Sequence, residues 1–135
     1  MKRVFVDANV FLRFVTVDDQ GHHEKAGELF TSASARKIEL ICGPPVLFEV
    51  AWTLKSAYAL SPARILDILE AIAAFPGLLL ADSATVLSAL VLARESGVDF
   101  ADAYIAASAQ SLGVDQIATF NTKHFKRLDV ALYPL

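Results

Sequence analysis

The stretch RVFVDANVFL at residues 3–12 places a short apolar run directly before an apolar helical pattern, with polar side chains at the junction. Arg3 to Val6 is typical of a buried strand, and the helical segment after Asp7-Ala8-Asn9 runs to about Val15. A strand that passes at once into a helix is the building unit of α/β proteins.

The same alternation continues along the rest of the chain. We predict further strands over Ile38–Cys42, Leu78–Leu80 and Gln116–Phe120, and a last edge strand over Val130–Tyr133. Helices are predicted over His22–Ala35 (after a break at Asp18–Gly21), over Pro45–Tyr58, from Ser61-Pro62 to Pro76-Gly77, from Asp82 or Ser83 to Gly97, and over Asp99–Leu112, with a short turn at Lys123–Arg127. Strands separated by helices pair in parallel through right-handed crossovers. The predicted fold is therefore a three-layer α/β/α domain with a central, mostly parallel sheet of four to five strands.

Length and composition indicate one globular domain over residues 1–135. Hydrophobic residues make up 55% of the chain and charged residues 20%, which excludes a disordered protein and favours a homodimer or an obligate partner. No apolar stretch reaches the roughly 18 residues of a membrane-spanning helix, and Asp7 interrupts the only run that resembles an export signal. Cys42 is the only cysteine and is expected to be a buried apolar side chain. We therefore expect a cytoplasmic protein with no membrane association.

The net charge of −3 argues against a protein that coats nucleic acid through bulk electrostatics. Lys123, Lys126 and Arg127 nevertheless form a local basic cluster. This cluster could face a phosphate, or it could be an ordinary solvated helix end.

Two carboxylates stand in apolar surroundings. Asp7 lies at the carboxyl end of the first strand, where it could hold a cation or cap the next helix; Asn9 could also cap. Glu49 is the only charged residue between Glu39 and Lys55, and its alternative role is in a narrow polar stripe with Thr53 and Ser56.

Two further carboxylates, Asp99 and Asp102, open a later helix on nearly the same face. Asp99 is the expected N-cap and Asp102 the expected metal ligand. Thr119 and Asn121 follow the fourth predicted strand, and the carboxyl ends of parallel strands share one edge of a sheet. Clustered carboxylates and an amide oxygen favour Mg²⁺, with Mn²⁺ as a substitute, over zinc. A metal of this kind activates water for phosphodiester hydrolysis without a nucleophilic side chain.

In order along the chain, Asp7-Ala8-Asn9, Phe48-Glu49-Val50, Asp99 to Ala103 and Thr119-Phe120-Asn121 resemble the motifs of PIN domains. Among PIN domains the chain is most similar to the VapC-type toxins of toxin–antitoxin pairs. The resemblance covers nearly the whole chain and implies a Mg²⁺- or Mn²⁺-dependent endoribonuclease that is dimeric and is held inactive by a small antitoxin protein.

By this resemblance, Asp7, Glu49 and Asp102 take the positions of the family's invariant acids, and Asp99 that of a more variable one. Thr119 matches a hydroxyl residue near the metal. Asn9 and the basic cluster are expected to serve the RNA substrate or to support the ligands. Asn121 is a departure, because the family often carries aspartate there, so a second metal is in doubt.

Two other functions remain open from the sequence. A PIN fold that has lost catalysis could act as a partner-binding module, which Asn121 would suit. A phosphotransfer protein phosphorylated on Asp7 is the second alternative, but position 9 carries Asn9 where a phosphatase of that kind would need an acid. His124 could approach a substrate phosphate, although a surface role is the more common one.

Overall fold

The computed structural model describes all residues, 1–135, and contains one parallel sheet. Its strands are β1 (Lys2–Phe5), β2 (Ile38–Cys42) and β3 (Leu78–Leu80), in the order β1-β2-β3. Val4 pairs with Leu40, and Ile41 pairs with Leu79. The predicted parallel pairing is confirmed, but the sheet has three strands rather than four to five.

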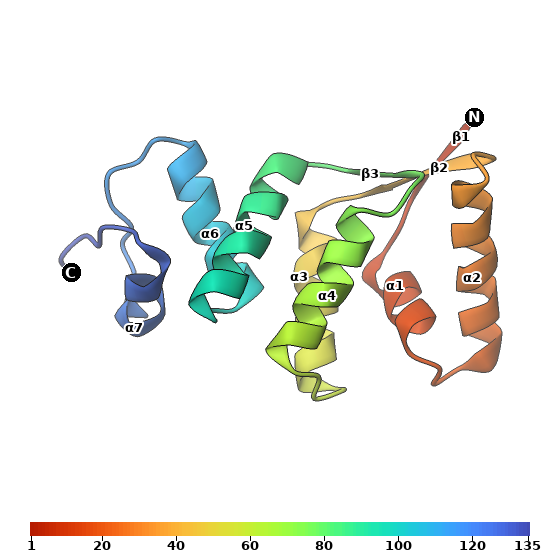
Figure 1. The fold of residues 1–135 in the computed structure, drawn as a ribbon, viewed down its shortest axis with the longest axis horizontal. Helices are drawn as coiled ribbons and strands as arrows, with labels where there is room; N and C mark the ends of the chain where they lie inside the picture. The colour runs from red at the N-terminus through yellow and green to blue at the C-terminus, as the bar shows by residue number, and fades with distance from the viewer.

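Both crossovers contribute two helices. The helices between β1 and β2 are α1 (Ala8–Val15) and α2 (Gln20–Ser34), and those between β2 and β3 are α3 (Pro44–Ser56) and α4 (Pro62–Ala73). These four helices lie below the strands in Figure 1, on one side of the sheet. The sheet side chains directed toward them, among them Leu40, Cys42 and Leu80, are buried in the hydrophobic core.

The opposite face of the sheet has no helical cover. Arg3, Phe5 and Leu79 alternate with the buried positions and are exposed, and Arg3 forms an ion pair with Glu39 on this face at 3.1 Å. The expected third layer is therefore missing from this arrangement. The first strand, predicted to be buried, lies at the edge of the sheet.

The rest of the chain forms a separate group of helices beside α3 and α4. It contains α5 (Ser83–Ser96), α6 (Phe100–Ser111), the short α7 (Thr122–Phe125) and a 3-10 turn, η1 (Lys126–Leu128). In Figure 1 this C-terminal unit lies at the left end of an elongated molecule, and α1 and α2 lie at the right end. None of the helices has both the length and the apolar character needed to cross a membrane.

The predicted fourth and fifth strands are not strands in the structure. Gln116–Phe120 and Val130–Tyr133 meet only in one isolated parallel bridge, between Ile117 and Leu132. Local sequence favours an extended conformation at both places, but a strand also needs a neighbour along its length.

Helix boundaries follow local capping chemistry. Ser61 caps α4 by accepting a hydrogen bond from the N–H of Arg64, with Pro62 in the first turn, as predicted.

Helix α2 begins at Gln20, within the predicted break, because the side chain of Asp19 accepts a hydrogen bond from the N–H of His22. This bond also lowers the pKa of Asp19. Helix α3 ends at Ser56, before the predicted Tyr58.

Burial of Cys42 gives a direct test of the core. The thiol is completely buried, and this desolvation raises its pKa to about 11. We expect the folded protein to resist a thiol reagent at pH 8, where Cys42 stays protonated, and to react with one equivalent in urea. A Leu112→Cys variant, which introduces a thiol at a position 78% exposed, should react rapidly without urea and serves as the control. Fast reaction of the folded wild type would contradict the burial of Cys42.

Candidate metal centre

Asp7 occupies the position that the sequence predicted, directly after β1. It is the N-cap of α1, and its Oδ1 accepts a hydrogen bond of 2.7 Å from the N–H of Ala8. The carboxylate is exposed and forms no ion pair. Asn9 is also exposed, in the first turn of α1. Asp7 therefore caps α1, which was one of its two expected roles. The second oxygen of its carboxylate remains accessible.

Glu49 extends from α3 into solvent, between the buried side chains of Leu47 and Val50. No hydrogen bond or ion pair engages its carboxylate. Helices α1 and α3 pack against each other, so Asp7 and Glu49 belong to adjacent elements. Both acids are available to a ligand that approaches from solvent.

Asp99 contacts a residue far away in the sequence. It sits at the N-cap of α6, as predicted, but its side chain makes no capping bond. Instead its Oδ2 lies 3.3 Å from Nζ of Lys55 on α3, in an ion pair with both side chains more than half exposed. A pair this exposed adds little to stability. The pair joins the start of α6 to the C-terminal end of α3.

Asp102 has polar partners from the chain after α6. Its Oδ2 lies 3.2 Å from Nδ1 of His124, and the side-chain amide of Asn121 lies 3.0 Å from the same nitrogen. One nitrogen cannot donate and accept at once, so only one of these contacts is a hydrogen bond at any moment. The N–H of Asn121 donates to Oγ1 of Thr119 at 3.0 Å.

We call Asp102, Thr119, Asn121 and His124 the α6–α7 polar cluster. Three of these were predicted site residues, and the structure brings them together. His124, for which a surface role was the better expectation, is half-buried beside Asp102. The sequence feature that could have predicted this place is its spacing: His124 lies three residues after Asn121, and residues three apart on a helical turn are neighbours.

The basic cluster lies next to these residues. Lys123 is in α7, Lys126 and Arg127 are in η1, and all three are exposed. The guanidinium of Arg127 donates to the carbonyl oxygen of Ser96, which ties η1 to the end of α5. The two lysines form no ion pair and are free to meet an anion.

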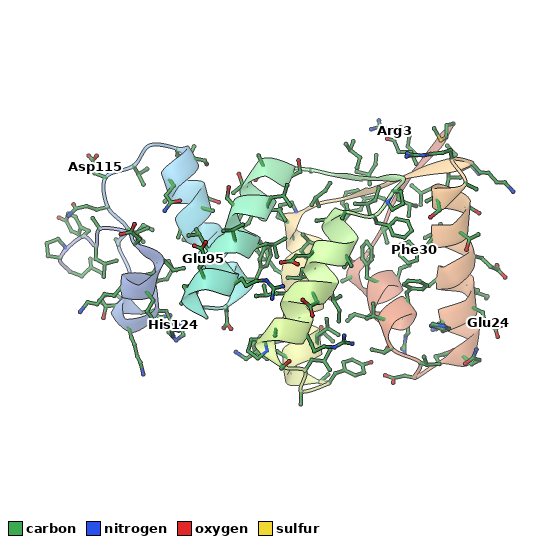
Figure 2. All side chains as sticks on the ribbon, in the orientation of Figure 1. Arg3, Glu24, Phe30, Glu95, Asp115 and His124 are labelled. Atoms are coloured by element: carbon green, nitrogen blue, oxygen red, sulfur yellow. The ribbon has the colours of Figure 1, made fainter.

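The two halves of the predicted site lie apart. Figure 2 labels His124 in the C-terminal unit, to the left of α3 and α4, whereas α1, which Asp7 caps, lies to their right. No group of three or more histidine, cysteine or acidic side chains is close enough to hold a metal. The predicted donors are all oxygens and suit Mg²⁺ chemically, but this arrangement does not gather them.

An apolar cavity of about 290 Å³ lies where the C-terminal unit meets α3 and α4. Trp52, Leu66 and Phe100 are among its lining residues, and Asp99 is on its wall. Asp7, Glu49 and Asp102 do not line it. This cavity is therefore separate from the predicted principal metal ligands.

Comparison with protein families matches residues 4–131 to the PIN domain. The chain therefore belongs to the PIN domain family, a family of metal-dependent nucleases whose members typically bind a divalent metal. The matched range contains Asp7, Glu49, Asp99, Asp102 and Asn121. No curated protein matches the chain.

Proposed function

We propose that the protein is a divalent-metal-dependent endoribonuclease that hydrolyses phosphodiester bonds in RNA. Membership of the PIN family over residues 4–131 carries this proposal, because the match spans every acid of the predicted site. Asp7, Glu49 and Asp102 are the proposed principal metal ligands, with Asp99 and Asn121 as additional ones. Mg²⁺ is the proposed cofactor, with Mn²⁺ as a substitute.

Accessibility of the acids supports this assignment. No polar or charged side chain in the protein is buried, so each proposed ligand can exchange water for a metal or a phosphate. The free Lys123 and Lys126 lie beside the α6–α7 polar cluster and suit the backbone of a bound RNA.

We further propose that the nuclease is the toxin of a type II toxin–antitoxin pair and is held inactive by a small antitoxin protein. The support for this narrower role is the order of the motifs, from Asp7-Ala8-Asn9 to Thr119-Phe120-Asn121, within a single domain. A PIN fold that binds a partner without cutting RNA is the second candidate, and the dispersed acids of this arrangement favour it.

Cleavage assays separate the two candidates. Purified protein, freed of any partner, is incubated with structured RNAs in Mg²⁺, in Mn²⁺ and in a chelator. We expect cleavage with either metal and none in the chelator, with recovery when metal is restored. Wild-type protein that is folded, is dimeric and leaves every RNA intact with both metals would favour the binding module.

A further inference from the structure

The free edge of β1 is an unusual feature of this sheet. Val4-Phe5-Val6 is apolar, yet β1 pairs only with β2, and its other edge meets no strand. An exposed edge of this kind presents unpaired backbone groups that can accept another strand. On the uncovered face beside this edge, Phe5 is 64% exposed and Leu79 is 53% exposed.

A segment that could pair with the free edge of β1 lies at the other end of the molecule. Gln116–Phe120 has the sequence of a strand, but the backbone N–H groups of Ala118, Thr119 and Phe120 donate to no backbone oxygen. Phe120 is 91% exposed, and Leu87 and Val91 form an exposed apolar stripe on α5 in the same unit. The unit therefore has both an unpaired strand and an apolar helix face, which are the two things that the sheet lacks.

Contacts with α3 and α4 keep this unit away from its own β1. Arg94 of α5 is within 3.0 Å of carboxylate oxygens of both Asp67 and Glu70 on α4. Phe48 of α3 packs on Phe100 and Tyr104 of α6, with ring centroids 5.6 and 5.1 Å apart. Figure 2 labels Arg3 of β1 and Asp115 at opposite ends of the molecule. Pairing within one chain would break these contacts, whereas a second copy can pair without losing them.

We propose that two copies of the chain exchange their C-terminal units, so that Gln116–Phe120 of each copy adds in parallel to β1 of the other. The apolar stripe of α5 then covers the open face of the partner sheet. Charges favour the parallel direction: with Phe5 opposite Phe120, Lys2 at the start of β1 lies diagonal to Asp115 before the added strand, and Asp7 after β1 lies next to Lys123. None of these four residues has an ion pair within the chain.

The exchange completes the metal centre across two copies. In a parallel pair the end of the added strand lies at the end of β1, so Asn121 of one copy comes beside Asp7 of the other. Asp102 accompanies Asn121 because both contact His124. Asp7 and Glu49 are thus supplied by one copy, and Asp102, Thr119 and Asn121 by its partner. This composite site rests on the proposed nuclease function, whereas the strand exchange does not.

A disulfide test examines the pairing without any activity. A Phe5→Cys chain and a Phe120→Cys chain, carrying tags of different size, are unfolded together, refolded and oxidised; the buried Cys42 stays unreactive. We expect a covalent dimer that contains both tags. A second pair in the same register, Arg3→Cys with Ala118→Cys, keeps both phenylalanines in place. A Leu112→Cys chain mixed with Phe5→Cys is the exposed control and should give no such product.

Two results would overturn the exchange. One is a monomer by light scattering with no mixed-tag product from either pair. The other is a chain carrying both Phe5→Cys and Phe120→Cys that forms its disulfide only internally, which would mean that each chain closes on its own β1.

An activity test then examines the composite site. Asp7→Asn and Asp102→Asn chains, each inactive alone, are refolded together. About a quarter of the wild-type rate should return, because half of the randomly assorted dimers are mixed and each mixed dimer has one intact site of two. If the mixture stays at the level of the single variants although the mixed-tag disulfide forms, the composite site is wrong. If wild-type protein cuts no RNA but the disulfide forms, the nuclease function fails and the exchange stands.

Discussion

Changing Asp7 to asparagine is expected to lower metal-dependent RNA cleavage by roughly 10²- to 10³-fold. The substitution removes the negative charge of a proposed metal ligand but changes the size of the side chain very little. Asparagine is as good an N-cap as aspartate, and its amide oxygen can still accept the hydrogen bond from the N–H of Ala8. The free energy of unfolding should therefore change by less than about 0.5 kcal/mol.

Lost cleavage with unchanged stability would separate the two roles of Asp7, the proposed metal ligand and the N-cap of α1. Cleavage rate and urea unfolding are measured on the same preparations of wild type, Asp7→Asn and Glu28→Gln. Glu28 is an exposed carboxylate on α2 with no ion pair, so its variant should match wild type in both measurements. A fully active Asp7→Asn protein would reduce Asp7 to a helix cap.

The sequence predicted most of the local structure, because short-range chemistry determines it. Strands β2 and β3 have the predicted bounds, and β1 is shifted by one residue to Lys2–Phe5. The start of α4 at Ser61-Pro62 follows from capping and from the fixed φ of proline. In each case the deciding groups lie within a few residues of one another.

The order of the sheet was not predictable in the same way. Gln116–Phe120 has a strand sequence, but whether it joins β1 depends on where α5 and α6 pack. That packing rests on contacts between residues far apart in the sequence, such as Phe48 of α3 with Phe100 and Tyr104 of α6. Hydrophobic alternation carries no information about such pairs, so the prediction of four to five strands in one sheet was wrong for this arrangement.

The same distinction explains the candidate site. Asp102 lies near Asn121 and Thr119 because the segment that follows α6 folds back beside this helix. The structure has this cluster. Joining it to Asp7 and Glu49 needs the sheet to extend beyond β1. The acids could therefore be named from the sequence, whereas their assembly depends on an interface that the exchange between copies supplies.

Changing Gly77 to alanine is expected to destabilise the fold by about 3 kcal/mol or more. Gly77 precedes β3 with φ of +90°, and a Cβ there would lie 2.4 Å from the carbonyl oxygen of Ala33 near the end of α2. The obstacle is backbone, which cannot rotate away as a side chain can. The carbonyl of Gly77 also accepts the N–H of Leu40 on β2, so a shift of Gly77 disturbs the sheet and α2 together.

Gly113 provides the matched control for this substitution. It also has a positive φ, +68°, but a Cβ at Gly113 would meet no atom within 4 Å. Gly113→Ala should therefore cost only the backbone strain, about 1–2 kcal/mol. The difference between the two variants in urea unfolding, followed by circular dichroism, isolates the contact with Ala33. Equal losses would mean that β3 does not approach α2 this closely, and the three-strand core that positions Asp7 would then need a different packing.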